Sequence, residues 1–346
     1  MISISKNYFR SPIKLGFIPL CDAAPLLIAE ELGIYKKYNL NVELKKQIGW
    51  ATIQDKLLSG ELDTSHAIAP LIFKEPTPHA YPCGELVTAM ILSTNGNAIT
   101  ISNSLSKICI QNGISLKEYR EKNLNCRKLV FASVYPSSYH QVLLNKWLTK
   151  NNLNPAKDVK FIISPPSLIH DLLAKGSIDG FCVGEPWNSF SSEKRTGQIV
   201  ETSESLDDGH IEKVLITTEK FAANRPLEHS HLIAALLESC KFCEDKRNIN
   251  EIIKILSQSK YLNLPKNIIA KSFKNELLYG KDQTVNHCHH FFSETLNKPT
   301  LIKGLHLRDE LIGNKIIKKE NFSQEIVESL FLESTFIEAE NLFLQK

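Results

Sequence analysis

Three absences limit what this sequence of 346 residues can encode. No apolar stretch approaches the roughly 18 residues that cross a bilayer, so no membrane insertion is expected. Basic and acidic residues are almost balanced, 41 against 38, which gives no reason to expect direct nucleic-acid binding. A Walker A loop, a Gly-rich dinucleotide turn and a nucleophile elbow are all missing. The sequence therefore lacks the common marks of a membrane, nucleic-acid-binding or nucleotide-dependent protein.

The start of the chain lacks the apolar core of a secretion signal. Charges at Lys6, Arg10 and Lys14 interrupt the first twenty residues. The eight cysteines are irregularly spaced, which favours free thiols in a reducing compartment. We therefore predict a cytoplasmic location; a periplasmic one is the alternative if a signal segment preceded this sequence and was removed.

A metal site is not expected either. Cys240 and Cys243 have a C-x-x-C spacing within a helical pattern, but a metal site needs a second pair of ligands. Nothing in the sequence places His287, His289 or His290 next to them. We predict no metal, no cofactor and no catalytic residues.

The feature that is present, and that organises the chain, is a duplicated unit. LLSGELD at 57–63 leads into the apolar run HAIAP, and LLAKGSID at 172–179 leads into GFCVGEPW. Each copy is typical of a helix end, a glycine stop, an acidic turn and a buried strand. The repetition predicts two similar α/β lobes, with a ligand between them.

Periodicity and turn residues place the elements of both lobes. In the first lobe we expect a β-α-β-α-β order that implies a parallel sheet, with Asp22 as the N-cap of its first helix. The first lobe is predicted at 1–100 and 216–346, including C-terminal helices, and the second at 101–215. Expected strands are 13–18, 41–44, 64–69, 87–92, 98–101, 128–132, 159–163, 180–183 and 213–217. Expected helices are 23–32, 50–58, 139–150, 167–175, 232–242 and 248–256.

Several motifs together resemble the nitrate/bicarbonate class of ABC-transporter solute-binding proteins. The similarity runs from about 13 to 290, and the sequence departs from the family in its C-terminal portion. The resemblance implies a periplasmic-binding-protein-like fold of type II, in which two α/β lobes close on a small planar oxyanion. The motifs are GFIPL at 16–20, DAAP at 22–25, ELGIY at 31–35, GWATIQDKL at 49–57, NGNAI at 95–99, Tyr135-Pro136 with His140, Pro165-Pro166 and CVGEPWN at 182–188.

The resemblance also implies an anion pocket. Trp50 would form an apolar wall, Asn97 and His140 would donate hydrogen bonds, Pro166 would line the second lobe's side, and Lys213 would supply the positive charge. The transporter proteins carry a longer Gln at the position of Asn97. In the bicarbonate-binding branch an acidic residue and a metal ion stand where Lys213 stands here, so Lys213 favours nitrate or nitrite.

Other polar residues are given structural roles. A carboxylate would repel an anion, so Glu185 is predicted to fix a loop or join the lobes, although it follows a strand end where α/β sheets bind ligands. No function is assigned to the scattered histidines, which are His66, His79, His170, His210, His229, His231 and His306.

Two roles for such a binding protein stay open. We favour a cytoplasmic nitrate sensor, which the resemblance implies would control nitrate assimilation by holding an RNA-binding antiterminator until nitrate binds. The alternative is the substrate-binding component of a nitrate/nitrite ABC transporter, with a permease and an ATPase as partners. A remote alternative is an enzyme like the one that makes the thiamin pyrimidine, which uses active-site His and Cys residues on a related fold.

Overall fold

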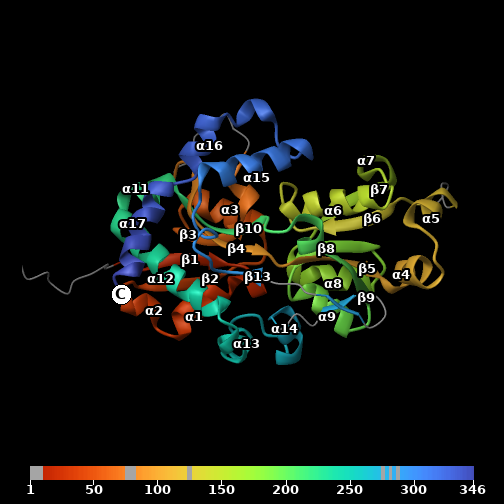
Figure 1. Cartoon of the computed structure of the whole chain (residues 1–346), viewed down its shortest axis with the longest axis horizontal. Helices are drawn as coiled ribbons and strands as arrows, with labels where there is room; N and C mark the ends of the chain where they lie inside the picture. Colours follow the sequence, from red (N-terminus) through yellow and green to blue (C-terminus); the bar gives the residue numbers. More distant parts are fainter. Residues whose placement is uncertain (1–10, 75–82, 123–126, 274–276, 280–282, 286–288) are drawn as a thin grey trace, which may run out of the picture.

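The computed structural model of the chain describes residues 11–74, 83–122, 127–273, 277–279, 283–285 and 289–346. These residues form two α/β lobes that lie side by side, each built on one sheet (Figure 1). His79, Cys126, His287 and Cys288, which the sequence drew attention to, lie outside the described residues. The periplasmic-binding-protein-like fold predicted from the sequence is therefore confirmed at the level of two sheet-containing lobes.

The first lobe is built on a six-stranded sheet with the order β13-β4-β10-β3-β1-β2. Its central strands are buried along their whole length, because helices cover the sheet on both faces. Its strands are β1 (Ile13–Phe17), β2 (Val42–Lys46), β3 (Thr64–Ile68), β4 (Leu86–Asn95), β10 (Ile211–Thr218) and β13 (His289–His290).

The second lobe is built on a seven-stranded sheet with the order β12-β11-β9-β5-β8-β6-β7. Its strands are β5 (Asn97–Ser102), β6 (Leu129–Ser133), β7 (Val159–Ile163), β8 (Gly180–Gly184), β9 (Gly197–Thr202), β11 (Leu277–Tyr279) and β12 (Gln283–Val285). The last two strands come from the part of the chain that follows the first lobe's helices, so the chain enters this sheet a second time.

The two sheets repeat one topology, as the duplicated sequence unit predicts. In each, three strands run parallel in the order second-first-third (β2-β1-β3 and β7-β6-β8), and two antiparallel strands follow (β10-β4 and β5-β9). The expectation of a parallel sheet is thus right for the βαβαβ part and wrong for the whole. Each lobe completes its sheet with strands that lead to or from the other lobe, and these run antiparallel.

Two of the passages of the chain between the sheets are tight turns. The first is Asn95-Gly96, where both residues have positive φ (60° and 87°), and the second is Asp208–His210, with Gly209 at φ 77°. A Cβ on Gly96 would lie 2.1 Å from His289 Nδ1, so the turn requires glycine for space as well as for conformation. The strands change sheet a few residues before the boundaries drawn at 100 and 215, and that division into lobes stays a prediction.

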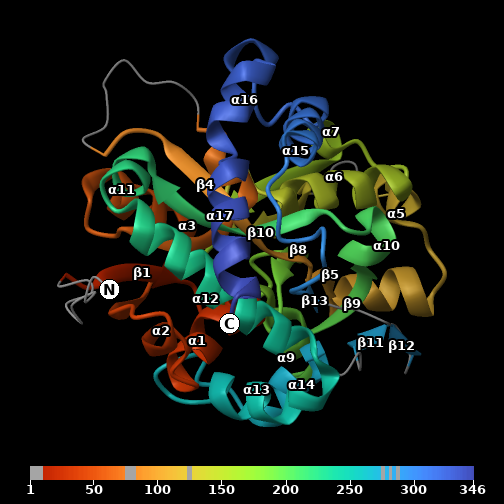
Figure 2. The same ribbon diagram turned by 60° about the vertical axis from the view of Figure 1, so that its left-hand side comes forward.

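Helices of the first lobe cover both faces of its sheet. Helix α12 packs against α1, α2 and α17, and the C-terminal helix α17 lies along it in Figure 2. The helical segments are η1 (Cys21–Ala23), α1 (Ala24–Glu31), α2 (Ile34–Lys37), α3 (Trp50–Ser59), η2 (Ala69–Ile72), α11 (Glu219–Asn224), α12 (Pro226–Glu244), η4 (Lys246–Asn248), α13 (Ile249–Leu256), α14 (Lys266–Phe273), α15 (Leu301–Gly313), η5 (Lys319–Asn321), α16 (Gln324–Leu330) and α17 (Glu333–Leu344).

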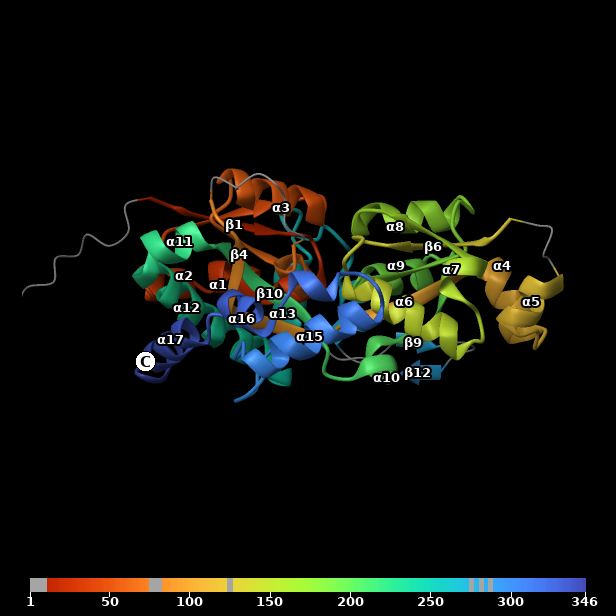
Figure 3. The ribbon, with the colours of Figure 1, turned by 90° about the horizontal axis from the view of Figure 1, so that it is seen from above.

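In the second lobe, α6 and α8 flank the sheet. Figure 3 shows α8 on the same side of the molecule as α3 of the first lobe, the helix that precedes the equivalent strand. The helical segments are α4 (Asn103–Ser106), η3 (Lys107–Gln111), α5 (Leu116–Lys122), α6 (Tyr139–Lys150), α7 (Pro155–Asp158), α8 (Pro166–Ala174), α9 (Trp187–Glu193) and α10 (Ser203–Asp207).

Polar contacts bridge the lobes at their rims. Tyr135 Oη donates to Gln54 Oε1 at 2.8 Å, and Lys146 pairs with Glu310 at 2.9 Å. At the opposite rim, Lys271 pairs with Glu193 at 2.6 Å. The residues between these contacts are shielded from solvent.

Candidate functional site

Strand β10 places two adjacent charged residues, Glu212 and Lys213, at the junction of the lobes. Both are fully buried. Neighbouring residues of a regular strand point to opposite faces. The pairing of β10 with β4, however, shifts register between Ile211 and Lys213 and again between Lys213 and Val214. Irregularities of this kind redirect side chains, and here the Lys213 ammonium and the Glu212 carboxylate meet as an ion pair.

Lys213 also pairs with the first lobe. Its Nζ lies 2.8 Å from Asp22 Oδ2 and 5.4 Å from the centroid of the Trp50 ring. Burial by itself would lower the pKa of Lys213, but the two carboxylates outweigh it, and the pKa lies above its usual value. The side chain is therefore a permanent cation in a dry environment, placed against the face of an indole ring.

Asp22 is part of this network and is not the N-cap that the sequence indicated. Helix α1 begins after Ala23 and has no side-chain cap. The Asp22 carboxylate is fully buried, and its Oδ1 lies 2.8 Å from His66 Nε2. Burial would raise the pKa of Asp22, but the charge of Lys213 and the contact with His66 hold it below the usual value. The residue is an ionised partner of Lys213.

Glu212 connects Lys213 to the second lobe. Its Oε2 accepts a hydrogen bond of 2.6 Å from Asn97 Nδ2, where β5 begins, and lies 3.5 Å from His210 Nε2. Its Oε1 lies 3.5 Å from His140 Nε2 in α6. Burial would raise the pKa of Glu212, but Lys213 and then His140 hold it well below the usual value. The carboxylate is thus ionised, with donors from both lobes around it.

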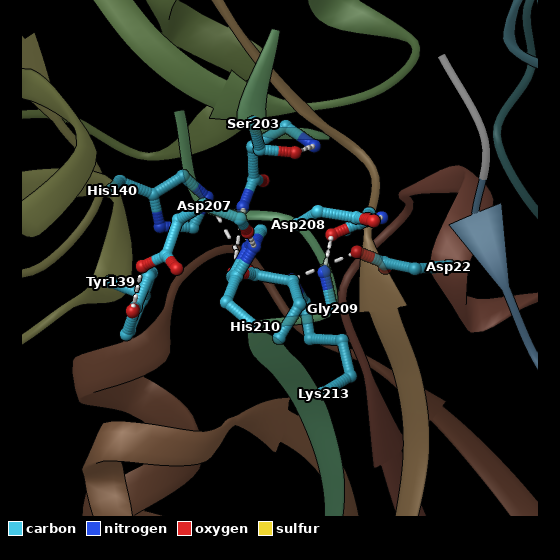
Figure 4. Close-up of polar contacts among 12 residues, drawn as sticks. Asp22, Tyr139, His140, Ser203, Asp207, Asp208, Gly209, His210 and Lys213 are labelled. Carbon is cyan, nitrogen blue, oxygen red and sulfur yellow. Dashed lines mark hydrogen bonds and ion pairs between the residues drawn. The ribbon is translucent and has the colours of Figure 1, made fainter. Parts of the chain in front are cut away.

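The segment between α10 and β10 positions His210. Its ring stacks on Tyr139 with centroids 4.6 Å apart, and Nδ1 lies 2.9 Å from the carbonyl oxygen of Asp207. Asp207 is held in turn by the Tyr139 hydroxyl and by Lys146. Figure 4 shows Tyr139, Asp207 and His210 together, with Asp22 and Lys213 on the other side of His210 from His140.

Several buried polar atoms around this network have no hydrogen-bond partner among the described residues. They include Trp50 Nε1, His66 Nδ1, Asn97 Oδ1, Ser138 Oγ and both ring nitrogens of His140. Native proteins rarely leave buried donors unpaired unless a ligand or water meets them. Ser138 is also the N-cap of the twelve-residue helix α6, where the helix dipole favours an anion. Burial lowers the pKa of His140 to about 4, so its ring is neutral.

The structure brings four of the five predicted residues together. Trp50 begins α3, Asn97 begins β5, His140 lies in the first turn of α6, and Lys213 lies in β10. Pro166, the fifth, is buried at the start of α8. Its neighbour Pro165 approaches the first lobe, since a Cβ on Gly49 would lie 3.9 Å from Pro165 Cγ. The role of each residue in binding stays a prediction.

Sequence reasoning missed four residues of this network: Asp22, His66, His210 and Glu212. Asp22 was interpreted as a cap, and the two histidines were set aside as scattered. The Glu-Lys pair at the start of a crossing strand was the available signal, because two adjacent charges in a strand with buried neighbours require partners. Nothing in the linear pattern shows that the partners are His66 and Asn97.

Glu185 has both of the structural roles predicted for it: it fixes a loop and joins the lobes. Its Oε2 accepts from the backbone N–H of Ser189 at 3.2 Å and from Ser272 Oγ in α14 at 3.1 Å. It therefore fixes the loop before α9 and ties that loop to a helix of the other lobe. Burial raises the pKa of this carboxyl, which favours its protonated form relative to an exposed glutamate.

The other cysteines that the sequence pointed to lie in a helix of the first lobe. Cys240 and Cys243 are buried free thiols in α12, and among the described residues no group of three His, Cys, Asp or Glu side chains could hold a metal ion. Nor does the described part of the chain contain a helix of the length and apolarity that a membrane span requires.

Comparisons with known proteins show which family the chain belongs to. The chain is 34% identical over 313 residues to the nitrate import ATP-binding protein NrtC of Synechocystis sp., covering 86% of this chain and 45% of that protein. It is 30% identical over 302 residues to the nitrate/nitrite binding protein NrtA of Synechococcus elongatus, covering 83% and 68%. The chain thus spans less than half of the first of these relatives.

A solved structure is similar to the whole fold of this chain. The periplasmic nitrate-binding protein NrtA from Synechocystis PCC 6803 superimposes with a TM-score of 0.88 at 25% identity, covering 96% of this chain and 88% of that one. The model of the NMT1-like family matches residues 10–257. The chain therefore belongs to the NMT1-like family and, within it, to the nitrate/bicarbonate class of solute-binding proteins.

Proposed function

We propose that this chain binds nitrate or nitrite between its lobes, without catalysis, and serves an ABC-type importer as its substrate-binding component. One observation carries the proposal. A permanently charged, fully buried Lys213 lies among donors without partners, with Trp50 on one lobe and Ser138 and His140 on the other. Nitrate is a weakly hydrated planar monoanion, and a few N–H and O–H donors with one cation in a dry environment suit it.

The comparisons support the importer role over the sensor role favoured from the sequence. The relatives include a nitrate/nitrite binding protein and an ATP-binding protein of nitrate import. In this role the partners are a permease and an ATPase, and the location is the periplasm.

Titration calorimetry tests the binding step directly. We expect nitrate and nitrite to bind with one site per chain, and sulfate, a dianion, to bind at least a hundredfold more weakly. Bicarbonate is the third anion to compare. If none of these anions binds at millimolar concentration, the proposal is wrong.

One observation favours the second candidate, a nitrate sensor. The ATP-binding protein NrtC is 34% identical to this chain although the chain spans only 45% of it, so a module of this kind exists within an ATPase subunit. Such a module would report the anion to a protein partner in the cytoplasm instead of delivering it to a permease. Pull-down from nitrate-fed and nitrate-starved cells separates the two roles. ABC-transporter subunits would support import, whereas an RNA-binding antiterminator released by nitrate would support the sensor.

A further inference from the structure

The carboxylate of Glu212 takes the position that an oxyanion would take. It lies among Asn97 Nδ2, His140 Nε2 and the ammonium of Lys213, which are three of the donors predicted for the anion. A carboxylate is a planar group with two negative oxygens, and nitrate is a planar group with three. Glu212 therefore resembles a ligand attached to the protein.

The charges of the network leave no surplus for a second anion. Lys213 is the one permanently charged cation described in it, and it is paired with both Asp22 and Glu212. Asp22 and Glu212 carry two negative charges against the one positive charge of Lys213, so an arriving anion is repelled unless a proton comes with it. The titratable groups that face Glu212 itself are His66 (β3), Tyr139 and His140 (α6), Cys182 (β8), His210 (the crossing segment), Lys213 (β10) and His289 (β13). Two further carboxylates act through these partners: Asp22 (η1) pairs with Lys213, and Asp207 (α10) contacts His210.

His210 is oriented to receive such a proton. Its Nδ1 lies 2.9 Å from a backbone carbonyl, which can only accept, so Nδ1 carries the hydrogen. With the hydrogen on Nδ1, Nε2 is a hydrogen-bond acceptor, 3.4 Å from Asn97 Nδ2 and 3.5 Å from Glu212 Oε2. A proton shared between this nitrogen and the carboxylate would remove the repulsion. The two groups, which otherwise only accept hydrogen bonds from a ligand, could then donate one.

We infer that Glu212 makes the pocket require one proton for each oxyanion that it binds. Nitrate has no proton, so the proton comes from solvent. In the complex this proton is held on the Glu212 carboxylate or on the imidazole of His210 or His140. Bicarbonate brings its own O–H, which can donate to Glu212, and needs no proton from solvent. Glu212 is thus a specificity-determining residue, and the inference rests on the proposed function of this site.

The test is calorimetric titration with sodium nitrate at pH 6, 7 and 8, in pairs of buffers whose ionisation enthalpies differ widely. We expect the wild type to take up about one proton per nitrate, so that affinity falls roughly tenfold for each unit of rising pH. Glu212→Gln keeps the shape and an acceptor for Asn97 but removes the charge. We expect its nitrate affinity at pH 8 to be at least about tenfold higher and its proton uptake to fall below about half a proton per nitrate.

Selectivity provides a second measurement. The ratio of bicarbonate to nitrate affinity at pH 8 should fall at least about tenfold in Glu212→Gln, because the charged carboxylate favours a ligand that carries a proton and a neutral amide does so much less. Glu201→Gln is the matched control: Glu201 is also buried, but it pairs with Lys150 on the second lobe's surface. It should match the wild type in both measurements.

The outcomes separate the inference from the proposed function. Nitrate binding without proton uptake by the wild type between pH 6 and 8 overturns the inference alone, even if Glu212→Gln does not fold. Weaker nitrate binding by a folded Glu212→Gln also overturns it. If neither protein binds nitrate, nitrite or bicarbonate, the proposed function fails and the inference with it.

Discussion

The two lobes share one sheet topology but contribute different chemistry to the junction between them. The first lobe contributes ionised side chains, Asp22 and Lys213, which are fully buried and paired. The second contributes neutral groups, Asn97, Ser138 and His140, at the start of a strand or a helix. A duplicated scaffold therefore carries charge on one side and hydrogen-bond donors on the other.

The difference assigns the two lobes separate roles in the proposed binding of an anion. The charged side supplies the cation, Lys213, but Asp22 and Glu212 cancel its attraction over distance, so it acts on a ligand only at close range. The neutral donors act only at hydrogen-bond range, so they add affinity only when both lobes reach the ligand. The following predictions test this division of roles, beginning with the largest expected effect.

Replacing the cation should remove binding and weaken the fold together. Lys213→Met leaves Asp22 and Glu212 buried without their counter-ion, a change that typically costs about 3–5 kcal/mol of stability. We expect nitrate affinity to fall well over about a hundredfold. Denaturation and calorimetry measure the two effects. Lys37→Met, which breaks a half-exposed pair with Glu238, should change neither by much. Binding within about threefold of wild type would place Lys213 outside the site.

Low pH should destabilise the first lobe through protonation of His229, which is not part of the proposed anion site. Burial lowers the pKa of His229, in α12, to about 4, against about 6.5 in the unfolded chain. The unfolded state therefore binds a proton first, and stability falls as pH drops from about 6.5 to 4, by about 3 kcal/mol.

His229→Phe should remove this contribution, because Phe keeps an aromatic ring beside Phe221 and cannot be protonated. Denaturant titrations at pH 7 and pH 4.5 measure the difference, and nitrate should not alter it. A variant that loses as much stability in acid as the wild type would show that His229 is not the group responsible.

Removing a neutral donor of the second lobe should have a smaller effect on binding than removing the cation. His140→Ala deletes a donor worth about 1–2 kcal/mol, so we expect nitrate affinity to fall about five- to thirtyfold. Calorimetry at constant pH measures it, with His306→Ala on the exposed face of α15 as the control. A loss as large as that of Lys213→Met would contradict the assigned division between the lobes.

The smallest expected effect concerns closure itself. We expect the ligand-free chain to open in solution and nitrate to close it, with a smaller radius of gyration by small-angle scattering. Tyr135→Phe removes the hydrogen bond to Gln54 across the rim and should lower nitrate affinity about two- to tenfold. Adding Gln54→Ala to this variant should cost little more, since the two residues share one interaction. A radius of gyration that bound nitrate leaves unchanged would contradict closure of the lobes on the ligand.

Much of the fold follows from local patterns. The helix at 139–150 and the strand at 159–163 were predicted to the residue, because apolar periodicity and turn residues are local signals. The same signals did not reveal β9, which pairs with β5, or the strands β11 and β12, which enter the second sheet from the far end of the chain. Short strands are decided by the partners they meet, and those partners are distant in sequence.

The repeated sequence unit predicted two similar α/β lobes, and the resemblance to the nitrate/bicarbonate class predicted that Trp50, Asn97, His140 and Lys213 lie together. That Asp22, His66, His210 and Glu212 join them became visible in the folded chain alone. The physical reason is that a buried charge must find its counter-charge in space. Lys213 found Asp22 about 190 residues earlier in the chain, and a register shift in β10 turned Glu212 toward the donors of the other lobe.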